Sequence, residues 1–392
     1  MQDFPGSDSL PEISHYRAMK SAIVLTGGGA RGAYQAGALR ALYELAKEEH
    51  QLDIFKNLVG ISAGSINAAY IASRLDDLDG ATSLLCELWK ALETKDVFRS
   101  DGISFGRTGL KLLRTLSLGG FSSKLRSENL GLLNTKPLHR TIEKHTDFNK
   151  IEKFSQDGTL ESLCITATDY ATSIGVTFFT GRPDIVDWRR HLRQSLRSPI
   201  YADHVMASTA IPIFFPPWSV RGRYFGDGCL RNTAPLSPAL HIGADKVIVL
   251  GVRRRKEANL TDDYIAPSLG RVLSVIINSV FLDAIESDFE RIQFVNRLLK
   301  NFGESAEGFR PVSMFYQTPS VTISEIASEY ADRLPSIFGF LMGGLGSPKE
   351  SAEILSYLTF LPSYCTNLVD LGYKDMKDRG EAMKTFLREP AR

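Results

Sequence analysis

The sequence predicts an α/β protein in three layers, with a mostly parallel sheet covered by helices. Short apolar runs of strand length, "SAIVL" at 21–25 and "NLVGI" at 57–61, each precede a segment with helical character. The alternation of strand and helix requires crossover connections, which favour parallel strands with helices packed on the sheet. At 392 residues the chain is long enough for one such domain and a further helical region.

The predicted elements follow one another in an order that fits this architecture. Residues 33–49 place Ala and Leu at helical spacing after the first strand, and residues 63–74 are rich in small side chains that suit a helix packed closely on a sheet. Residues 162–169 and 175–180 predict neighbouring strands joined by a turn. The apolar run at 245–252 predicts another buried strand, with which we expect the sheet to end.

Composition shifts divide the chain into three parts. Residues 1–19 form a polar tail without the apolar run of a secretory signal. Residues 20–255 carry the α/β pattern, with an irregular, Gly-rich insertion at about 95–130. Residues 256–392 predict a C-terminal helical region packed on the α/β domain, beginning with one long amphipathic helix over 267–301. No apolar stretch reaches the roughly 18 residues that suggest a membrane span.

Charge and cysteine usage exclude several classes of function. The 46 basic and 45 acidic residues give a net charge of +1, which does not indicate a nucleic-acid-binding surface. The four cysteines lie far apart without C-x-x-C spacing or clustered histidines, so we expect neither a disulfide framework nor a zinc site. These features predict reduced thiols, a cytoplasmic location, and no metal or cofactor.

The stretch "GGGARG" at 27–32 fits two kinds of anion site. Its glycines spell G-x-G-x-x-G, which can bind a dinucleotide, but a glycine-rich turn can also hold a reaction oxyanion. The dinucleotide interpretation requires an acidic residue about twenty positions later, at the end of the second strand. Asp53 has the right separation but precedes that strand, and Ser62 stands at the strand end. The sequence therefore favours the oxyanion interpretation over a nucleotide-binding oxidoreductase.

The strand end carries the motif G-x-S-x-G in "GISAG". This spacing suits a serine on a sharp strand-to-helix turn, because glycines at Gly60 and Gly64 avoid a Cβ collision with neighbouring elements. The dipole of the following helix favours negative charge at Ser62. A nucleophilic serine also needs a base. His241 has the chain order of a hydrolase triad but lies on a helix leading into a strand, whereas Asp227 lies between two glycines, in either a simple turn or an accessible catalytic loop.

Taken together, these motifs resemble the patatin-like phospholipase family over about residues 21–252. "GGGARG" is similar to the family's oxyanion loop, "GISAG" to its nucleophile elbow, "DG" at 227–228 to its D-G-[GA] motif, and "ASTAIPIFFPP" at 207–217 to the segment preceding the aspartate. The resemblance implies a Ser-Asp dyad without a histidine. Cys229 departs from the family's Gly or Ala. The implied roles are Ser62 as nucleophile, Asp227 as general base, and amide donors around Gly28 and Gly29 in an oxyanion loop formed by Gly27, Gly28, Gly29, Ala30, Arg31 and Gly32.

The implied activity is hydrolysis of a phospholipid or another lipid acyl ester through an acyl-enzyme intermediate. The alternatives are a catalytically idle lipid-binding or regulatory relative and, more distantly, the oxidoreductase. Phe214, Phe215 and Trp218 either line an acyl groove or belong to the core. The basic run at 253–256 either contacts anionic headgroups, which would make membrane contact peripheral, or is a solvated edge. The oligomeric state is left open.

Overall fold

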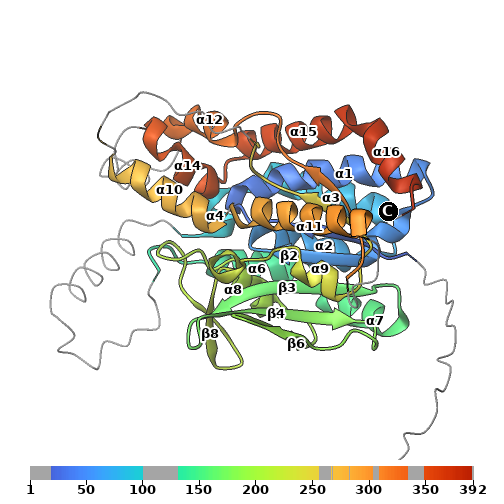
Figure 1. Cartoon of the computed structure of the whole chain (residues 1–392). Helices are drawn as coiled ribbons and strands as arrows, with labels where there is room; N and C mark the ends of the chain where they lie inside the picture. Colours follow the sequence, from blue (N-terminus) through green and yellow to red (C-terminus); the bar gives the residue numbers. More distant parts are fainter. Residues whose placement is uncertain are drawn as a thin grey trace, which may run out of the picture.

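The computed structural model describes residues 19–99, 131–255, 266, 268–281, 283–302, 309–333 and 348–390, and Figure 1 shows their arrangement. Strands and helices alternate from β1 to α2, as the sequence pattern predicts. In chain order the elements are β1 Ser21–Leu25, η1 Gly29–Arg31, α1 Gly32–Glu48, η2 Leu52–Lys56, β2 Asn57–Ile61, α2 Ala63–Ala72, α3 Leu78–Ala91, α4 Thr94–Val97, α6 Lys136–His145, α7 Phe148–Asp157, β3 Ser162–Asp169, β4 Ile174–Gly181, β5 Arg189–Arg190, β6 Arg193–Arg197, α8 Ala202–Ser208, β7 Trp218–Val220, β8 Arg223–Gly226, η4 Gly228–Arg231, α9 Ser237–His241, β9 Lys246–Leu250, α10 Leu269–Phe281, α11 Asp283–Phe302, β10 Ser313–Gln317, α12 Ile323–Ser328, η5 Ala331–Arg333, α14 Pro348–Leu358, α15 Pro362–Asp378 and α16 Gly380–Arg388.

The central sheet is mixed and mostly parallel. Its strands run in the order β10-β9-β1-β2-β3-β4-β6-β5, and the short β7–β8 hairpin joins it through β8 and β3. The five strands from β10 to β3 are parallel to one another, and β4 is antiparallel to β3. The expectation of a mostly parallel sheet covered by helices is confirmed.

One expectation for the chain after residue 252 is wrong. The sheet does not end with β9, because β10 pairs beside it in parallel from Ser313 to Gln317. The sequence "SMFYQ" is rich in residues that favour strands. It is short and lies between segments with helical patterns, so the pattern alone did not indicate a strand. The long helix expected over 267–301 falls on α10, Leu269–Phe281, and α11, Asp283–Phe302, and residue 282 lies outside the described residues.

The three layers follow from the alternation of side chains along each strand. One face of the sheet packs against α1, α2 and α3, and the other packs against α9 and α11. Successive residues of β1 point to opposite faces, so Ile23 belongs to the first core and Val24 to the second. The strands nearest the centre are buried on both sides, which explains why they read as continuous apolar runs.

Residues after 348 add a further layer of helices outside α1. Figure 1 shows α15 and α16 at the top of the view, and both contact α1. A Cβ on Gly37 would overlap the Val369 carbonyl oxygen, and a Cβ on Gly372 would overlap that of Tyr34. The backbones of α1 and α15 therefore pack unusually closely, because glycines lie at both contacts.

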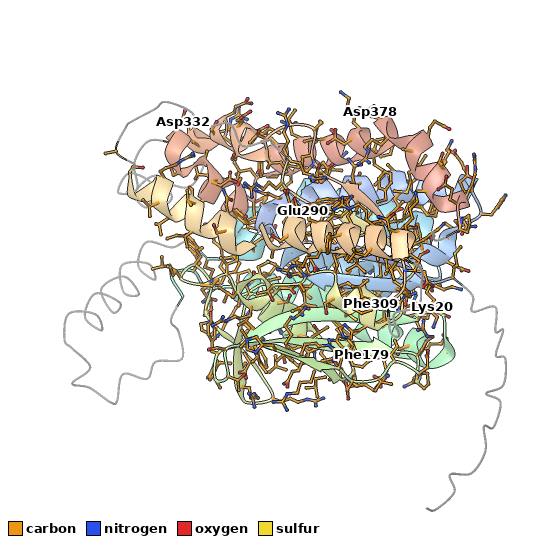
Figure 2. All side chains as sticks on the ribbon, in the orientation of Figure 1. Lys20, Phe179, Glu290, Phe309, Asp332 and Asp378 are labelled. Carbon is orange, nitrogen blue, oxygen red and sulfur yellow. The ribbon has the colours of Figure 1, made fainter. Side chains whose placement is uncertain are left out.

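Charged and apolar side chains separate between the surface and the interior. Figure 2 shows Glu290 on α11 and Asp378 at the end of α15, both exposed, whereas Phe179 on β4 is buried. No described helix combines the length and the apolar character needed to cross a membrane. Residues 1–18 of the predicted tail at 1–19, and most of the insertion at about 95–130, lie outside the described residues.

Candidate active site

The pairing of β3 brings Ser62 and Asp227 together. Along the edge of β3 away from β4, β2 runs parallel and ends with Ile61 opposite Thr166. The antiparallel β8 occupies the same edge farther along and ends with Gly226 opposite Thr168. Because β2 and β8 run toward each other along this edge of β3, their carboxyl ends lie close together. The residues that follow them, Ser62 and Asp227, are hydrogen-bonded there, with Ser62 Oγ donating to Asp227 Oδ2 at 2.6 Å.

Ser62 lies on a strained turn between β2 and α2. Its φ of 53° and ψ of −129° fall in a region that side-chain-bearing residues rarely adopt, at a cost of about 1–3 kcal/mol. Its neighbours hold this conformation, because the Ser62 N–H donates to Ser208 Oγ at 2.9 Å and its carbonyl accepts from the Ser65 N–H at 2.8 Å. A Cβ on Gly64 would collide with the Leu25 carbonyl oxygen, which is why this turn needs glycine.

Asp227 is fully buried, and burial alters its acidity. Desolvation raises the pKa of its carboxyl group to about 6, against the hydrogen bonds from Ser62 and Cys229, which lower it. Oδ1 accepts the Cys229 N–H at 2.9 Å, and Thr168 Oγ1 donates to the Asp227 carbonyl at 2.8 Å. The carboxylate is therefore fixed in place, with Oδ2 directed at the serine.

The glycine loop that begins after β1 lies directly beside the serine. A Cβ on Gly27 would come within 2.8 Å of Ser62 Cβ and 2.5 Å of Cys229 Sγ, so the loop, the serine and the unusual cysteine touch one another. Gly28 caps η1, and as a glycine it has no side chain to accept a hydrogen bond from this turn. The first N–H groups of a helix have no intrahelical acceptor, so this turn presents free amide donors. Gly29 and Ser62 line the same cavity.

Arg31 connects this loop to the C-terminal helix α14. Its side chain is only 2% exposed. Its Nη2 lies 3.1 Å from Glu353 Oε2, its Nε donates to Ser356 Oγ at 2.9 Å, and its guanidinium lies 4.4 Å from the centre of the Tyr357 ring. Burial alone would raise the pKa of Glu353, but the charge of Arg31 and hydrogen bonds including one from Ser324 hold that pKa below its usual value. These partners lie more than 320 residues from Arg31, so no local pattern could have identified them.

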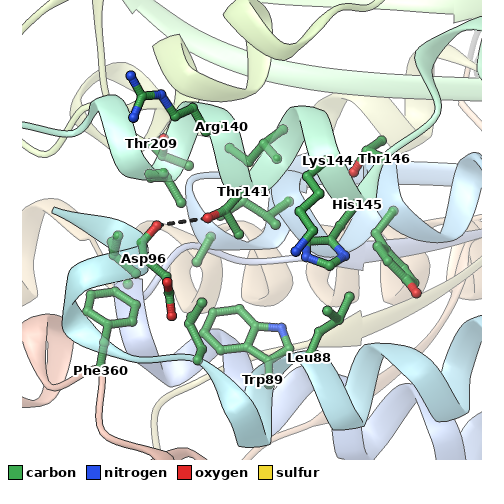
Figure 3. Close-up of a pocket in the computed structure, with 18 of the residues that line it drawn as sticks. Leu88, Trp89, Asp96, Arg140, Thr141, Lys144, His145, Thr146, Thr209 and Phe360 are labelled. Carbon is green, nitrogen blue, oxygen red and sulfur yellow. Dashed lines mark hydrogen bonds between the residues drawn. The ribbon is translucent and has the colours of Figure 1, made fainter.

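The serine opens into an apolar cavity of about 480 Å³. Ser62, Ile66 and Tyr70 line it from one face of α2, and α3 and α6 supply much of the opposing wall. Figure 3 shows Trp89 and Leu88 along this wall, together with Lys144 and His145 from α6. The Thr141 hydroxyl donates to the Asp96 carbonyl at 2.9 Å. Eight residues of helix separate Ser62 from Tyr70, so the cavity runs about 12 Å from the serine.

Comparison with known families identifies the chain. A family model described as patatin-like phospholipase matches residues 23–240. The chain belongs to the patatin-like phospholipase family. A sequence comparison with curated proteins finds no match.

Three solved structures of low sequence identity align with much of this chain. VipD from Legionella pneumophila is 11% identical, with 93% of this chain and 67% of that chain covered and a TM-score of 0.32. Human GIVD cytosolic phospholipase A2, bound to methyl gamma-linolenyl fluorophosphonate, is 12% identical, with 94% and 60% covered and a TM-score of 0.40. ExoU from Pseudomonas aeruginosa, in complex with SpcU, is 15% identical, with 84% and 54% covered and a TM-score of 0.31.

Other sequence-derived candidates lie elsewhere in the patatin-like fold. Among the described histidines, none hydrogen-bonds Ser62 or Asp227, and His241 stacks on Trp188 beside α9. Phe215 lines the cavity, whereas Trp218 stacks on His139. The four cysteines are buried free thiols, and the described residues contain no cluster suited to a metal ion.

Proposed function

We propose that this patatin-like phospholipase hydrolyses lipid acyl esters with Ser62 as nucleophile and Asp227 as general base. The observation that carries the proposal is the 2.6 Å hydrogen bond between Ser62 Oγ and the buried Asp227 carboxylate, at the end of an apolar cavity. Membership of the family supports a lipid ester substrate. The dyad and the assignment of each residue are our inference from this geometry.

In the first half-reaction Ser62 Oγ attacks the ester carbonyl carbon while its proton passes to Asp227 Oδ2. The carbonyl oxygen becomes an oxyanion, which we assign to the amide donors around Gly28 and Gly29. Collapse of this intermediate expels the alcohol, which takes the proton from Asp227, and leaves the acyl group on Ser62. Water then attacks the acyl-enzyme by the same route and releases the fatty acid.

The strength of the base is set by its burial. A carboxylate at its ordinary pKa is a poor acceptor for a serine proton at neutral pH, so a pKa of about 6 brings Asp227 closer to the range suited to general-base catalysis. Oxyanion donors must supply much of the remaining stabilisation, and one such donor is worth roughly 2.7–4 kcal/mol of the barrier. The free N–H groups at the start of η1 are suited to this role.

The cavity supports binding of one acyl chain. Its volume of about 480 Å³ lies within the range of ordinary ligand pockets, and its walls are largely apolar. The chain would extend from Ser62 along the α2 face that carries Ile66 and Tyr70. Such a substrate implies contact with lipid assemblies, and we propose that this contact is peripheral.

A fluorophosphonate probe tests the nucleophile directly. We expect the probe to label the wild-type protein at Ser62 and to leave Ser62→Ala unlabelled, and both Ser62→Ala and Asp227→Asn should lose ester hydrolysis. Ser65→Ala is a matched control, because Ser65 also lies at the start of α2 but its hydroxyl donates to the Ser62 carbonyl. Labelling or hydrolysis that survives in Ser62→Ala would refute the dyad. A panel of phospholipids and neutral acyl esters, scored by the fatty acid released, would then identify the substrate.

A further inference from the structure

A second cavity lies behind the glycine loop and differs in character from the apolar one. Its volume is about 670 Å³, and it is bounded by the chain after β9 and by α10, α12 and α14. The chain after β9 emerges at the carboxyl end of a parallel strand, which is where open α/β sheets commonly bind ligands. None of its described lining residues is shared with the apolar cavity.

Positive charge dominates the walls of this second cavity. Its described lining includes four arginines, Arg31, Arg253, Arg254 and Arg271, and two glutamates, Glu325 and Glu353. Glu353 is already paired with Arg31. Arg254 and Arg271 are exposed, come from different segments, and form no ion pair with any described carboxylate. Bringing several guanidinium groups to one cavity is unfavourable unless an anion compensates them.

Polar groups complete the walls. The lining also includes the hydroxyl-bearing residues Ser274, Ser279, Thr322, Ser324 and Ser328. Thr322 Oγ1 and Asn278 Oδ1 are buried atoms without a hydrogen-bond partner among the described residues. Buried polar atoms are seldom left unpaired in folded proteins. The guanidinium groups of Arg254 and Arg271, beside serine and threonine residues, suit a ligand that carries anionic oxygens.

We propose that this second cavity binds a phosphate monoester through Arg254 and Arg271. Guanidinium groups bind phosphate oxygens in bidentate fashion, and serine and threonine hydroxyls donate to the remaining oxygens. The cavity adjoins the glycine loop at two points, because Val252 would contact a Cβ on Gly28 at 2.5 Å and Glu353 holds Arg31. The site does not depend on the identity of the nucleophile, so it can be tested separately from the hydrolase proposal.

Titration calorimetry with sn-glycerol 3-phosphate tests the site on the full-length Ser62→Ala protein. We expect the double variant Arg254→Gln/Arg271→Gln to weaken binding at least tenfold. Arg189→Gln/Arg297→Gln removes the same charge from exposed positions elsewhere and should bind as the parent does. Because Arg254 and Arg271 are exposed, the melting temperature of their variant should not change, which excludes misfolding as the cause.

A phosphate monoester can be a free metabolite or a lipid headgroup, so a second arm uses vesicles. Cosedimentation is compared between phosphatidylcholine vesicles with phosphatidic acid and vesicles of phosphatidylcholine alone. Loss of vesicle binding in the Arg254→Gln/Arg271→Gln variant assigns a headgroup ligand, and an effect confined to glycerol 3-phosphate assigns a soluble one. The proposal is overturned if neither ligand binds, if the exposed control weakens binding equally, or if Lys144→Gln in the apolar cavity abolishes binding instead.

Discussion

Replacement of Asp227 by asparagine should abolish activity and change how stability depends on pH. The side chain keeps its shape but loses its charge, so the comparison isolates the cost of a buried carboxylate. Burial raises the Asp227 pKa from its ordinary value of 3.8 to about 6. In the wild type, the stability gained by protonating this group is fully present below pH 3.8 and is lost as the pH rises through about 6.

The magnitude follows from the pKa. A rise of about two pKa units, at 1.36 kcal/mol each, corresponds to about 3 kcal/mol over the full titration, of which about half falls between pH 5 and pH 8. The free energy of unfolding of Asp227→Asn, minus that of the wild type, should therefore increase by about 3 kcal/mol over the full titration. About half of this increase should appear between pH 5 and pH 8. The variant should gain stability near neutral pH, because the charge that our proposed mechanism requires on Asp227 is costly to bury.

Urea denaturation followed by tryptophan fluorescence between pH 5 and pH 8 measures this difference. Asp53→Asn serves as the control, because it removes the same charge from an exposed side chain. In parallel, wild-type kcat/KM should fall about tenfold per pH unit below about pH 6, as the base becomes protonated. A stability difference that stays constant with pH, or a kcat/KM midpoint near pH 4, would show that the buried carboxyl is not perturbed and would refute the reasoning.

Three further predictions concern the loop, the elbow and the cavity. Glu353→Gln should destabilise the fold by about 3–5 kcal/mol and slow fluorophosphonate labelling, because it leaves the Arg31 charge buried and unpaired. The exposed control Glu381→Gln should do neither. Urea titration and labelling rates measure the two effects. Ser62→Gly should be more stable than Ser62→Ala by about 1 kcal/mol, because glycine relieves the positive φ, and equal melting curves would contradict this strain. Ile66→Trp should fill the cavity and so lower the ratio of kcat/KM for a palmitate ester to kcat/KM for a butyrate ester at least tenfold. The same substitution at exposed Leu84 should leave this ratio unchanged. An unaltered ratio in Ile66→Trp would exclude this path for the acyl chain.

Local sequence patterns predicted much of the fold because they report on local physics. A strand buried on both faces must be apolar throughout, so β1, β2 and β9 were recognisable as short apolar runs. The same reasoning missed β10, which lies in a region dominated by helical periodicity. Whether a short segment becomes a strand depends on which neighbouring element it packs against, and the spacing of apolar residues does not carry that information.

The sequence by itself determined the chemical groups available in this protein: a serine in a strand-to-helix turn, an aspartate between glycines, and a glycine loop after the first strand. Only the tertiary structure decided that Ser62 and Asp227 meet, because β2 and β8 approach along one edge of β3, and that Arg31 is held by Glu353 from α14. A sequence motif reports only on residues that lie close together along the chain. Contacts between strands and helices hundreds of residues apart exist only once the sheet has assembled, and burial, which perturbs the Asp227 pKa, appears with them.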